Sequence, residues 1–388
     1  MPARSALFPR GAAVDPHELD RDAHRQLARL RETEPVSWVA SLGCWLVTGY
    51  DAAVQVMRDS ATYTVDDPRF STARVVGPSM LSLDGPEHAR HRAPFNPPFR
   101  PSRVRERFEA DVLRLAHGLV DEVEPRGAAE LRRELAGPLS VAVVAEVLGL
   151  EASDATTVLG WYAAIVDAVT STGPHDEIPA SAGTAMAALS ERVLDGARTT
   201  GSLLSTAAAR LDEQQVVANA AVMMFGGIET TEGMILSAVG HVLSHGVDLR
   251  GAGPDLLAAA VEESLRMEPA AAVVDRYATR DVDLGVARIG TGDLVRVSLT
   301  GANRDPAVFP DPDRFDPDRR NVRSQLAFAR GPHVCVAMDL ARLEARTALR
   351  AVAGLPGLRL AEPASARGLV FRKPPRLAVA WHTGNGPG

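Results

Sequence analysis

The segment spanning residues 215–243 constrains the fold more than any other part of the sequence. It is long and mostly apolar, as expected of a helix that is buried along much of its length. Gly226 and Gly227 interrupt it, although a glycine in a helix interior costs about 1 kcal/mol relative to alanine. Glu229 and Thr230 follow directly, and buried polar groups are costly unless they are paired. A core helix gains nothing from this arrangement, whereas a helix that admits a ligand to its backbone and passes protons to it does.

A kink where two helices cross is the simpler interpretation of the glycine pair, and the sequence favours it less. Val222, Gly226 and Thr230 recur every four residues, so they share one face of the helix. Gly226 and the Thr230 hydroxyl therefore look onto the same space. We expect that space to hold the ligand.

The composition predicts a mainly α-helical protein with a small β region. Of the 388 residues, 46% are hydrophobic, and Ala, Leu, Arg and Glu are abundant, which favours helices. No linker or repeat divides the chain. We therefore expect one domain over residues 17–382, between a flexible N-terminal segment (1–16) and a flexible tail (383–388). Three regions resemble strands: a hairpin of residues 36–39 with 45–48, residues 273–299, and residues 369–381.

Several classes of protein are disfavoured by the sequence. No apolar run reaches the roughly 20 residues that cross a bilayer, and the N-terminus lacks the layout of a signal peptide. Cys44 and Cys335 are the only two cysteines, too few for a disulfide framework. A net charge of −7 disfavours nucleic acid as a partner. We expect a cytoplasmic monomer that binds neither nucleic acid nor membrane.

Cys335 lies in a short loop that contains glycine, directly before a strongly helical run over residues 338–353. Because a helix N-terminus carries partial positive charge, a cysteine there is biased toward thiolate, the form that binds metals. The simplest alternative is a small buried cysteine that only packs. A zinc or iron–sulfur site built on His333 and Cys335 lacks further ligands nearby.

Phe328, Gly331, His333 and Cys335 have the spacing Phe-x-x-Gly-x-His-x-Cys. This spacing resembles the proximal loop of the haem-thiolate monooxygenases, the cytochromes P450. The segment at residues 226–230 is similar to the family's Ala/Gly-Gly-x-Asp/Glu-Thr motif, and the resemblance extends over residues 35–379. It implies the cytochrome P450 fold, with haem between the central helix and the helix after the cysteine.

The resemblance also assigns roles to residues of the two motifs. Cys335 would ligate the haem iron, and Phe328, Gly331, His333 and Ala337 would border the haem. On the opposite side, Gly226 and Gly227 would lie against the oxygen-binding position. Thr230 and Glu229 resemble the hydroxyl and acid that deliver protons there.

His88 and Arg92, four residues apart on a short helix, resemble the family's His-x-x-x-Arg, which binds haem propionates. Arg276 resembles a strand arginine with the same role, and His333 would add a further donor. Buried carboxylates need such charged partners. These residues together would form the propionate site.

Glu263 and Arg266, on a helix opened by Pro254, resemble the family's Glu-x-x-Arg. With Arg314 they would form a structural salt-bridge triad that supports the cysteine loop. Taken alone, Glu-x-x-Arg is most often a solvated surface pair. The substrate pocket implied by the resemblance is mostly apolar and comprises Met80, Leu81, Val222, Phe225, Ala272, Val274, Val370 and Phe371.

The chain departs from the family's pattern in two places. Ala329 and Ala337 stand where the family most often has glycine, which permits positive φ and close backbone approach. The change at Ala329 puts the detailed shape of the turn in doubt. Prolines 94, 97, 98 and 101 follow Arg92, so we expect the helix that carries His88 to end early or kink.

The implied enzyme activates O2 at haem b and oxidises a hydrophobic small molecule, such as an intermediate of secondary metabolism. We expect no fused reductase domain, so a ferredoxin and a ferredoxin reductase would pass on electrons from NAD(P)H. A candidate docking surface for ferredoxin consists of Arg319, Arg320, Arg323, Arg330, Arg342 and Arg346. Each of these alone is more commonly a solvated side chain.

Other activities remain open at this point. Phenol coupling, ring closure or decarboxylation would use the same apparatus. A haem-binding sensor without turnover is a further alternative, disfavoured by the acid and hydroxyl at Glu229 and Thr230. Peroxide-using members of the family generally lack that pair.

Overall fold

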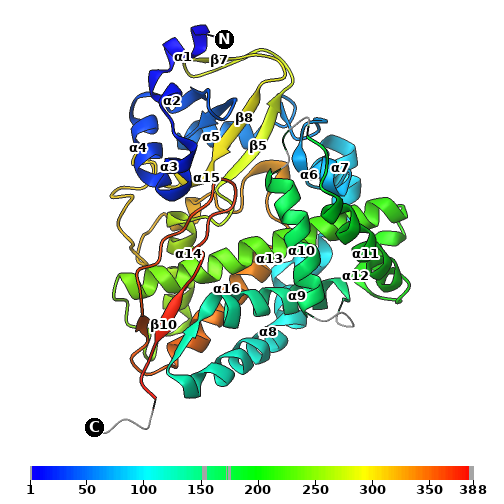
Figure 1. Cartoon of the computed structure of the whole chain (residues 1–388), viewed down its shortest axis with the longest axis vertical. Coiled ribbons are helices and arrows are strands. Elements are labelled where there is room, and N and C mark those ends of the chain that lie inside the picture. The colour runs from blue at the N-terminus through cyan, green and yellow to red at the C-terminus, as the bar shows by residue number, and fades with distance from the viewer. Residues whose placement is uncertain (1, 151–154, 172, 174–175, 384–388) are drawn as a thin grey trace.

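The computed structural model describes residues 2–150, 155–171, 173 and 176–383. Its helices form most of the molecule, and strands lie mainly on one side (Figure 1). The long helix α13 (Glu213–Ser244) runs through the middle of the helical part. Its sequence pattern predicts this helix closely, because only its two ends differ from the expected 215–243. The fold class, mainly α with a small β region, is confirmed.

Helix α13 is buried because other helices pack around it. It contacts α9 (Gly137–Leu148), α14 (Pro254–Met267) and α16 (Met338–Ala353), and α16 also packs on α8 (Pro101–Val123). The N-terminus of α13 has a capping box, in which Asp212 accepts from the Gln215 N–H and satisfies an otherwise unpaired donor. The predicted run over residues 338–353 is confirmed as α16.

Three further helices pack on α13 and on one another: α10 (Ala155–Ser171), α11 (Ala180–Ala197) and α12 (Leu203–Ala208). Several other α-helices are short, among them α3 (Pro16–Arg21), α4 (Ala23–Thr33), α5 (Tyr50–Arg58), α6 (Ser71–Val76), α7 (Gly85–Arg92) and α15 (Leu299–Ala302). None of the helices in the described ranges is both long and apolar enough to cross a membrane.

The main sheet has five strands in the order β1-β2-β8-β5-β3. Strands β1 (Val36–Val39) and β2 (Cys44–Val47) form the predicted antiparallel hairpin, with Val36 opposite Val47. Strand β8 (Leu294–Ser298) pairs in parallel with β2 and antiparallel with β5 (Val273–Ala278). The bounds of the others are β3 (Tyr63–Thr64), β4 (Ala128–Glu130), β6 (Val282–Leu284), β7 (Ala287–Ile289), β9 (Arg359–Leu360) and β10 (Ala378–Ala380).

The N-terminal segment is folded onto this sheet, so the expectation of a flexible segment over residues 1–16 is wrong for the described part. Helices α1 (Pro2–Leu7) and α2 (Pro9–Ala12) pack on β1. Arg4 lies 2.8 Å from Asp293 and its guanidinium stacks 4.8 Å from the Trp38 ring centroid. A Cβ on Gly11 would lie 2.1 Å from the Ser37 hydroxyl, so the contact requires glycine. Of the expected tail, residues 384–388 lie outside the described residues.

The prolines after Arg92 end α7 as expected. The helix stops at Arg92, and a short 3-10 turn over Pro97–Phe99 leads into α8 at Pro101. Proline at the first turn of α8 is tolerated because the N–H it lacks would be unpaired there. The prolines therefore separate α7 from α8 rather than bend one continuous helix.

Acid should destabilise the fold partly through His241 on α13. Its Nδ1 lies 2.9 Å from the Ser264 hydroxyl, and burial lowers the pKa of His241 to about 3. An unfolded histidine titrates near pH 6.5, so below that pH the unfolded chain binds more protons than the folded chain. We expect His241 to contribute a loss in the free energy of unfolding, at up to about 1.4 kcal/mol per pH unit, as the pH falls from 6.5 toward 3.

Urea unfolding at pH 7 and pH 5 measures this effect for the wild type and His241→Gln. The variant should lose less stability between the two pH values than the wild type does. An equal loss in both proteins would show that His241 does not carry the effect.

Candidate active site

The loop around Cys335 is held by its own main chain and by α5. The Cys335 N–H donates to the Phe328 carbonyl oxygen at 2.9 Å, and the Ala337 N–H donates to the Cys335 sulfur. Gly331 has φ = +78°, and a Cβ there would lie 2.4 Å from the Met57 carbonyl oxygen. Gly331 is therefore required both by its conformation and by its close approach to α5.

Ala329 adopts the left-handed conformation, with φ = +60°. This position is where the family most often has glycine, and a left-handed alanine costs roughly 1–2 kcal/mol. Ala337 differs, because its φ of −99° is open to any residue. The loop keeps its turn with alanine at position 329, at the expense of local strain.

We expect Ala329→Gly to raise the free energy of unfolding by about 1 kcal/mol, because glycine has no Cβ to strain the turn. Ala337→Gly is the matched control in the same loop, and it should leave stability unchanged or lower it. Chemical denaturation of the two variants tests the pair. A gain from Ala337→Gly equal to that from Ala329→Gly would argue against strain at Ala329.

Burial raises the pKa of the Cys335 thiol, against the opposing effects of the Ala337 N–H and the Arg92 guanidinium. In the polypeptide alone, burial therefore outweighs the bias toward thiolate that the helix N-terminus was expected to give Cys335. A bound metal cation deprotonates a coordinating thiol outright. Cys44, in contrast, is wholly buried in β2, and burial raises the pKa of its thiol to about 12.

The two glycines of α13 have different surroundings. A Cβ on Gly226 would meet no atom within 4 Å, whereas a Cβ on Gly227 would lie 2.6 Å from Val144 Cγ2 on α9. Gly226 therefore faces open space, beside Thr230, whose hydroxyl donates to the Gly226 carbonyl oxygen at 2.6 Å. The expectation that both glycines face the ligand is corrected, since Gly227 serves the close packing of α13 on α9.

Glu229 is buried and points toward Tyr162 and Lys373, two residues not predicted from the sequence to belong to the site. Its carboxylate lies 2.8 Å from Lys373 Nζ and accepts a hydrogen bond from the Tyr162 hydroxyl. The contact of the neighbouring Thr230 is with the Gly226 carbonyl oxygen. Glu229 and Thr230 are thus adjacent, but their side chains engage different partners. One signal in the sequence could have drawn attention to Lys373, because it is the only lysine in the chain.

His88, Arg276 and His333 lie near Asp84, and Arg92 lies against the adjacent cysteine loop. His333 Nε2 lies 2.8 Å from Asp84 Oδ1, and the ring centroids of His88 and His333 are 4.3 Å apart. Arg92 donates to a main-chain carbonyl oxygen of the cysteine loop at 2.5 Å. Arg276 on β5 is 4% exposed and is electrostatically coupled to Asp84. The predicted propionate-binding residues are therefore brought together from α7, β5 and the loop.

Asp84 is the anion at the centre of this group. Burial acts to raise the pKa of its carboxyl, but hydrogen bonds from His333, Thr64 and the Val65 N–H outweigh burial and lower the pKa to about 2. Asp84 therefore stays charged at neutral pH and fixes the orientation of the His333 ring.

Two members of this group have unused capacity for an anion. His88 Nε2 is buried without a hydrogen-bond partner among the described residues, and burial, with His333 and Arg92, lowers the pKa of His88 to about 4. Arg276 donates to the Asp275 carbonyl oxygen at 2.7 Å, and no carboxylate in the described ranges forms an ion pair with it. A ligand that carries carboxylates would satisfy both groups. These residues, beside Cys335 and the open face at Gly226, fit a haem.

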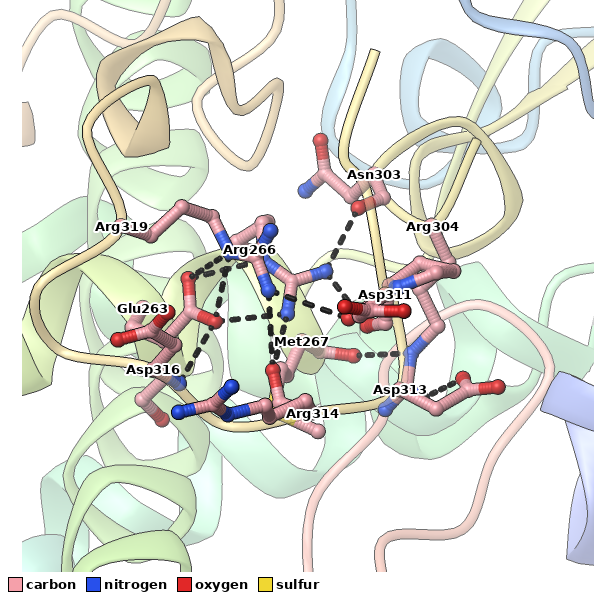
Figure 2. Close-up of polar contacts among 12 residues, drawn as sticks. Glu263, Arg266, Met267, Asn303, Arg304, Asp311, Asp313, Arg314, Asp316 and Arg319 are labelled. Carbon is pink, nitrogen blue, oxygen red and sulfur yellow. Dashed lines mark hydrogen bonds and ion pairs between the residues drawn. The ribbon is translucent and has the colours of Figure 1, made fainter. Parts of the chain in front are cut away.

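The salt-bridge triad is present, with one correction to its membership (Figure 2). Glu263 and Arg266 are fully buried and form a bidentate pair at 2.8 Å. The third cation is Arg319, whose Nε lies 3.0 Å from Glu263 Oε1. The predicted Arg314 is exposed and contributes its main-chain carbonyl oxygen to Arg266.

Arg266 and Arg319 together hold the segment that leads to the cysteine loop. Arg266 donates to the carbonyl oxygens of Asn303 and Pro312 at 3.1 and 2.8 Å. The Asn303 side chain in turn accepts from the Leu326 N–H at 2.6 Å. This chain of contacts links α14 to the residues just before Phe328, so the triad is placed to support the cysteine loop.

The predicted docking surface is smaller than expected. Arg319 belongs to the buried triad and is therefore not part of the docking surface. Arg342 pairs with Glu262 at 2.5 Å and lies 4.6 Å from the Phe328 ring centroid, so it also supports the loop. Arg320, Arg323 and Arg346 are exposed, and Arg330 is half-buried.

Most of the predicted pocket residues lie in one apolar cluster with α13. These are Met80, Leu81, Val222, Phe225 and Phe371, and the cluster also includes Phe328 and Ala337. The Ala272 N–H donates to the Val370 carbonyl oxygen at 2.9 Å, which joins these two positions. Val274 packs with the apolar cluster of the sheet instead.

Within residues 2–150, 155–171, 173 and 176–383, no group of three or more His, Cys, Asp or Glu side chains is placed to hold a metal ion. His333 contacts Asp84 and His88 rather than joining Cys335. The zinc or iron–sulfur alternative therefore lacks a set of protein ligands in the described part of the chain. One protein sulfur beside an anion site remains, which suits a haem held by a cysteine thiolate.

Known proteins are similar to this chain in sequence and fold. Residues 255–352 match the family model described as Cytochrome P450. The chain is 35% identical over 363 residues to cytochrome P450 monooxygenase PikC of Streptomyces venezuelae, over 85% of this chain and 83% of that protein. It is 33% identical to nocardicin C N-oxygenase of Nocardia uniformis subsp. tsuyamanensis, over 93% and 96% of the two chains. The crystal structure of CalO2 has a TM-score of 0.87 and 30% identity, over 96% and 100% of the chains. This chain therefore belongs to the cytochrome P450 family of monooxygenases.

Proposed function

We propose that this chain holds haem b through Cys335 and uses O2 to oxidise a hydrophobic small molecule, an intermediate of secondary metabolism. The observation that carries the haem assignment is the cluster of His88, Arg92, Arg276 and His333 beside the Cys335 loop. It offers a buried His88 nitrogen with no hydrogen-bond partner among the described residues, and the buried Arg276 guanidinium, next to Cys335, which is partly accessible. Haem supplies the oxygen activation and oxygen transfer, and the protein supplies binding, orientation and protons.

Two groups of residues would have separate tasks. Cys335 would supply the sulfur that holds the iron, while His88, Arg276 and His333 would hold the propionates. On α13, Gly226 leaves room beside the Thr230 hydroxyl. Thr230 would donate a proton into that space, and Glu229 would resupply it from the buried side of α13.

The substrate pocket is apolar and suits a hydrophobic molecule. Phe225, Val222 and Phe371 lie in one cluster with Met80 and Leu81, and they would exclude water and orient the carbon that is oxidised. One relative is named nocardicin C N-oxygenase, and its name supports the oxidation of an organic molecule as the reaction class. A separate ferredoxin and ferredoxin reductase deliver the electrons from NAD(P)H, with Arg320, Arg323, Arg330 and Arg346 as the docking side.

The absorption spectrum of the reduced protein with carbon monoxide tests the haem assignment. A strongly red-shifted Soret band in the wild type, lost in Cys335→Ser, would support ligation by the Cys335 thiolate. A band typical of imidazole or thiol ligation would contradict it, and protein without haem would overturn the proposed function. Product formation with NADPH, a ferredoxin and its reductase then separates an enzyme from a haem sensor.

A further inference from the structure

Lys373 is the only lysine in the chain, because every other residue among the 42 lysines and arginines is arginine. Its side chain is 13% exposed, and its Nζ lies 2.8 Å from Glu229 Oε1 and 2.9 Å from Glu232 Oε1. The Tyr162 hydroxyl is 3.5 Å away. The single lysine therefore sits between two buried carboxylates of α13 and a tyrosine of α10.

The main chain holds Lys373 at this position. The N–H groups of Arg367 and Lys373 donate to each other's carbonyl oxygens at 3.1 and 3.2 Å. A Cβ on Gly233 of α13 would lie 3.2 Å from Lys373 Cβ and 3.3 Å from the Arg372 carbonyl oxygen. Glycine at position 233 thus allows the segment to lie directly against α13, one turn after Glu229.

The chemistry of the contact requires lysine rather than arginine. An ammonium group has three N–H donors in a tetrahedral arrangement, matching three acceptors on Glu229, Glu232 and Tyr162. Arginine would supply charge but with planar geometry, and it does not release a proton in proteins. Lysine can both carry the charge and transfer a proton.

The contacts also reach the surface of the molecule. Glu232 Oε1, which contacts Lys373, lies 2.6 Å from Arg132 Nε. The Arg132 side chain is 39% exposed, whereas that of Glu232 is 5% exposed. A row of polar groups therefore runs from solvent at Arg132 through Glu232 and Lys373 to Glu229.

We propose that Lys373 is a positioning residue that holds the Glu229 carboxylate and returns a proton to it in each turnover. The inference rests on the proposed role of Glu229 as proton source for Thr230. In each turnover the Lys373 ammonium transfers one proton to the Glu229 carboxylate and becomes a neutral amine, and Glu229 passes that proton on to Thr230. Solvent then supplies one proton through Glu232 to restore the ammonium, so the row returns to its starting charge.

Lys373→Arg in the holoenzyme distinguishes this role from that of a structural ion pair. In Lys373→Arg the charge remains but no proton can be released. We expect product formed per electron to fall at least about tenfold, peroxide release to rise, and the solvent isotope effect on turnover to increase, as proton transfer of this kind contributes about 10²–10⁴ in rate. A structural ion pair predicts that Lys373→Arg restores all three to the wild-type values.

The control is Arg376→Met, which removes an exposed cation from the same segment. Arg376 is 61% exposed and lies 3.4 Å from Glu362. This variant should keep the wild-type yield of product per electron. A loss in Arg376→Met equal to that in Lys373→Arg would attribute the effect to a general disturbance of the segment and overturn the proposal.

A measurement that needs no turnover tests the contact itself. In protein labelled with lysine carrying ¹³C at Cε, the NMR spectrum contains one lysine signal, that of Lys373. We expect this signal to shift in Glu229→Gln and in Glu232→Gln, and to stay unchanged in Glu362→Gln. A signal unaffected by Glu229→Gln would overturn the inference.

The two proposals fail in different ways. Wild-type protein without the thiolate signature in its carbon monoxide spectrum would refute the proposed function. A normal signature together with wild-type coupling and isotope effect in Lys373→Arg would refute only the role of Lys373.

Discussion

Arg266→Met should lower the free energy of unfolding by about 3–5 kcal/mol, the loss typical of breaking a buried ion pair. The Arg266 and Glu263 side chains are both 0% exposed, so the variant leaves the Glu263 carboxylate buried with Arg319 as its remaining cation. Arg266 also donates to carbonyl oxygens on the way to the cysteine loop. We therefore expect weaker haem retention together with the loss of stability. Urea unfolding and the haem content of purified protein measure the two effects.

Arg314→Met and Arg319→Met are the matched comparisons, because they test which arginine completes the triad. Arg314 is exposed, and its substitution should change the free energy of unfolding by less than about 0.5 kcal/mol. Arg319 has a side chain 7% exposed and contacts Glu263, so its substitution should be strongly destabilising. If Arg314→Met proved the more harmful of the two, the assignment of Arg319 would be wrong.

Thr230→Ala should preserve haem binding and stability but divert electrons from product to hydrogen peroxide. The Thr230 hydroxyl donates to the Gly226 carbonyl oxygen on the open face of α13. Alanine lacks this hydroxyl, so the side chain at position 230 can no longer pass on a proton. We expect the rate of product formation to fall by about 10²–10⁴. Oxygen uptake, peroxide and product, measured together, give the partition of electrons.

Thr230→Ser is the control for this prediction, since it restores a hydroxyl at the same place. Serine should recover much of the coupling that alanine loses. Full coupling in Thr230→Ala would refute proton delivery by Thr230, while the carbon monoxide spectrum would still report whether the haem site is intact.

Local patterns were sufficient to predict the parts of the site that lie on one element. The helix around Gly226 and Thr230 follows from apolar length, and the early end of α7 follows from the prolines after Arg92. The position of Cys335 directly before α16 follows from loop and helix-forming composition. In each case the relevant neighbours are a few residues apart, so helix period and residue spacing determine them.

The errors concern contacts between residues that are far apart in the sequence. Arg314 and Arg319 are five residues apart in one irregular segment, and spacing cannot decide which guanidinium turns inward to Glu263. In the same way, the sequence before Pro16 predicts a flexible segment, yet Arg4 forms an ion pair with Asp293 on the sheet. Such outcomes depend on the path of the chain after packing.

The sequence by itself determined the central helix, the cysteine loop and the membership of the motifs that mark a haem-thiolate protein. Only the tertiary structure decided that Gly227 serves packing on α9, that Arg319 completes the triad and that Lys373 reaches Glu229. The physical reason is that a helix or turn is specified by neighbours within a few residues. The partner of a buried charge is specified by whichever segment the packed core brings within hydrogen-bond distance.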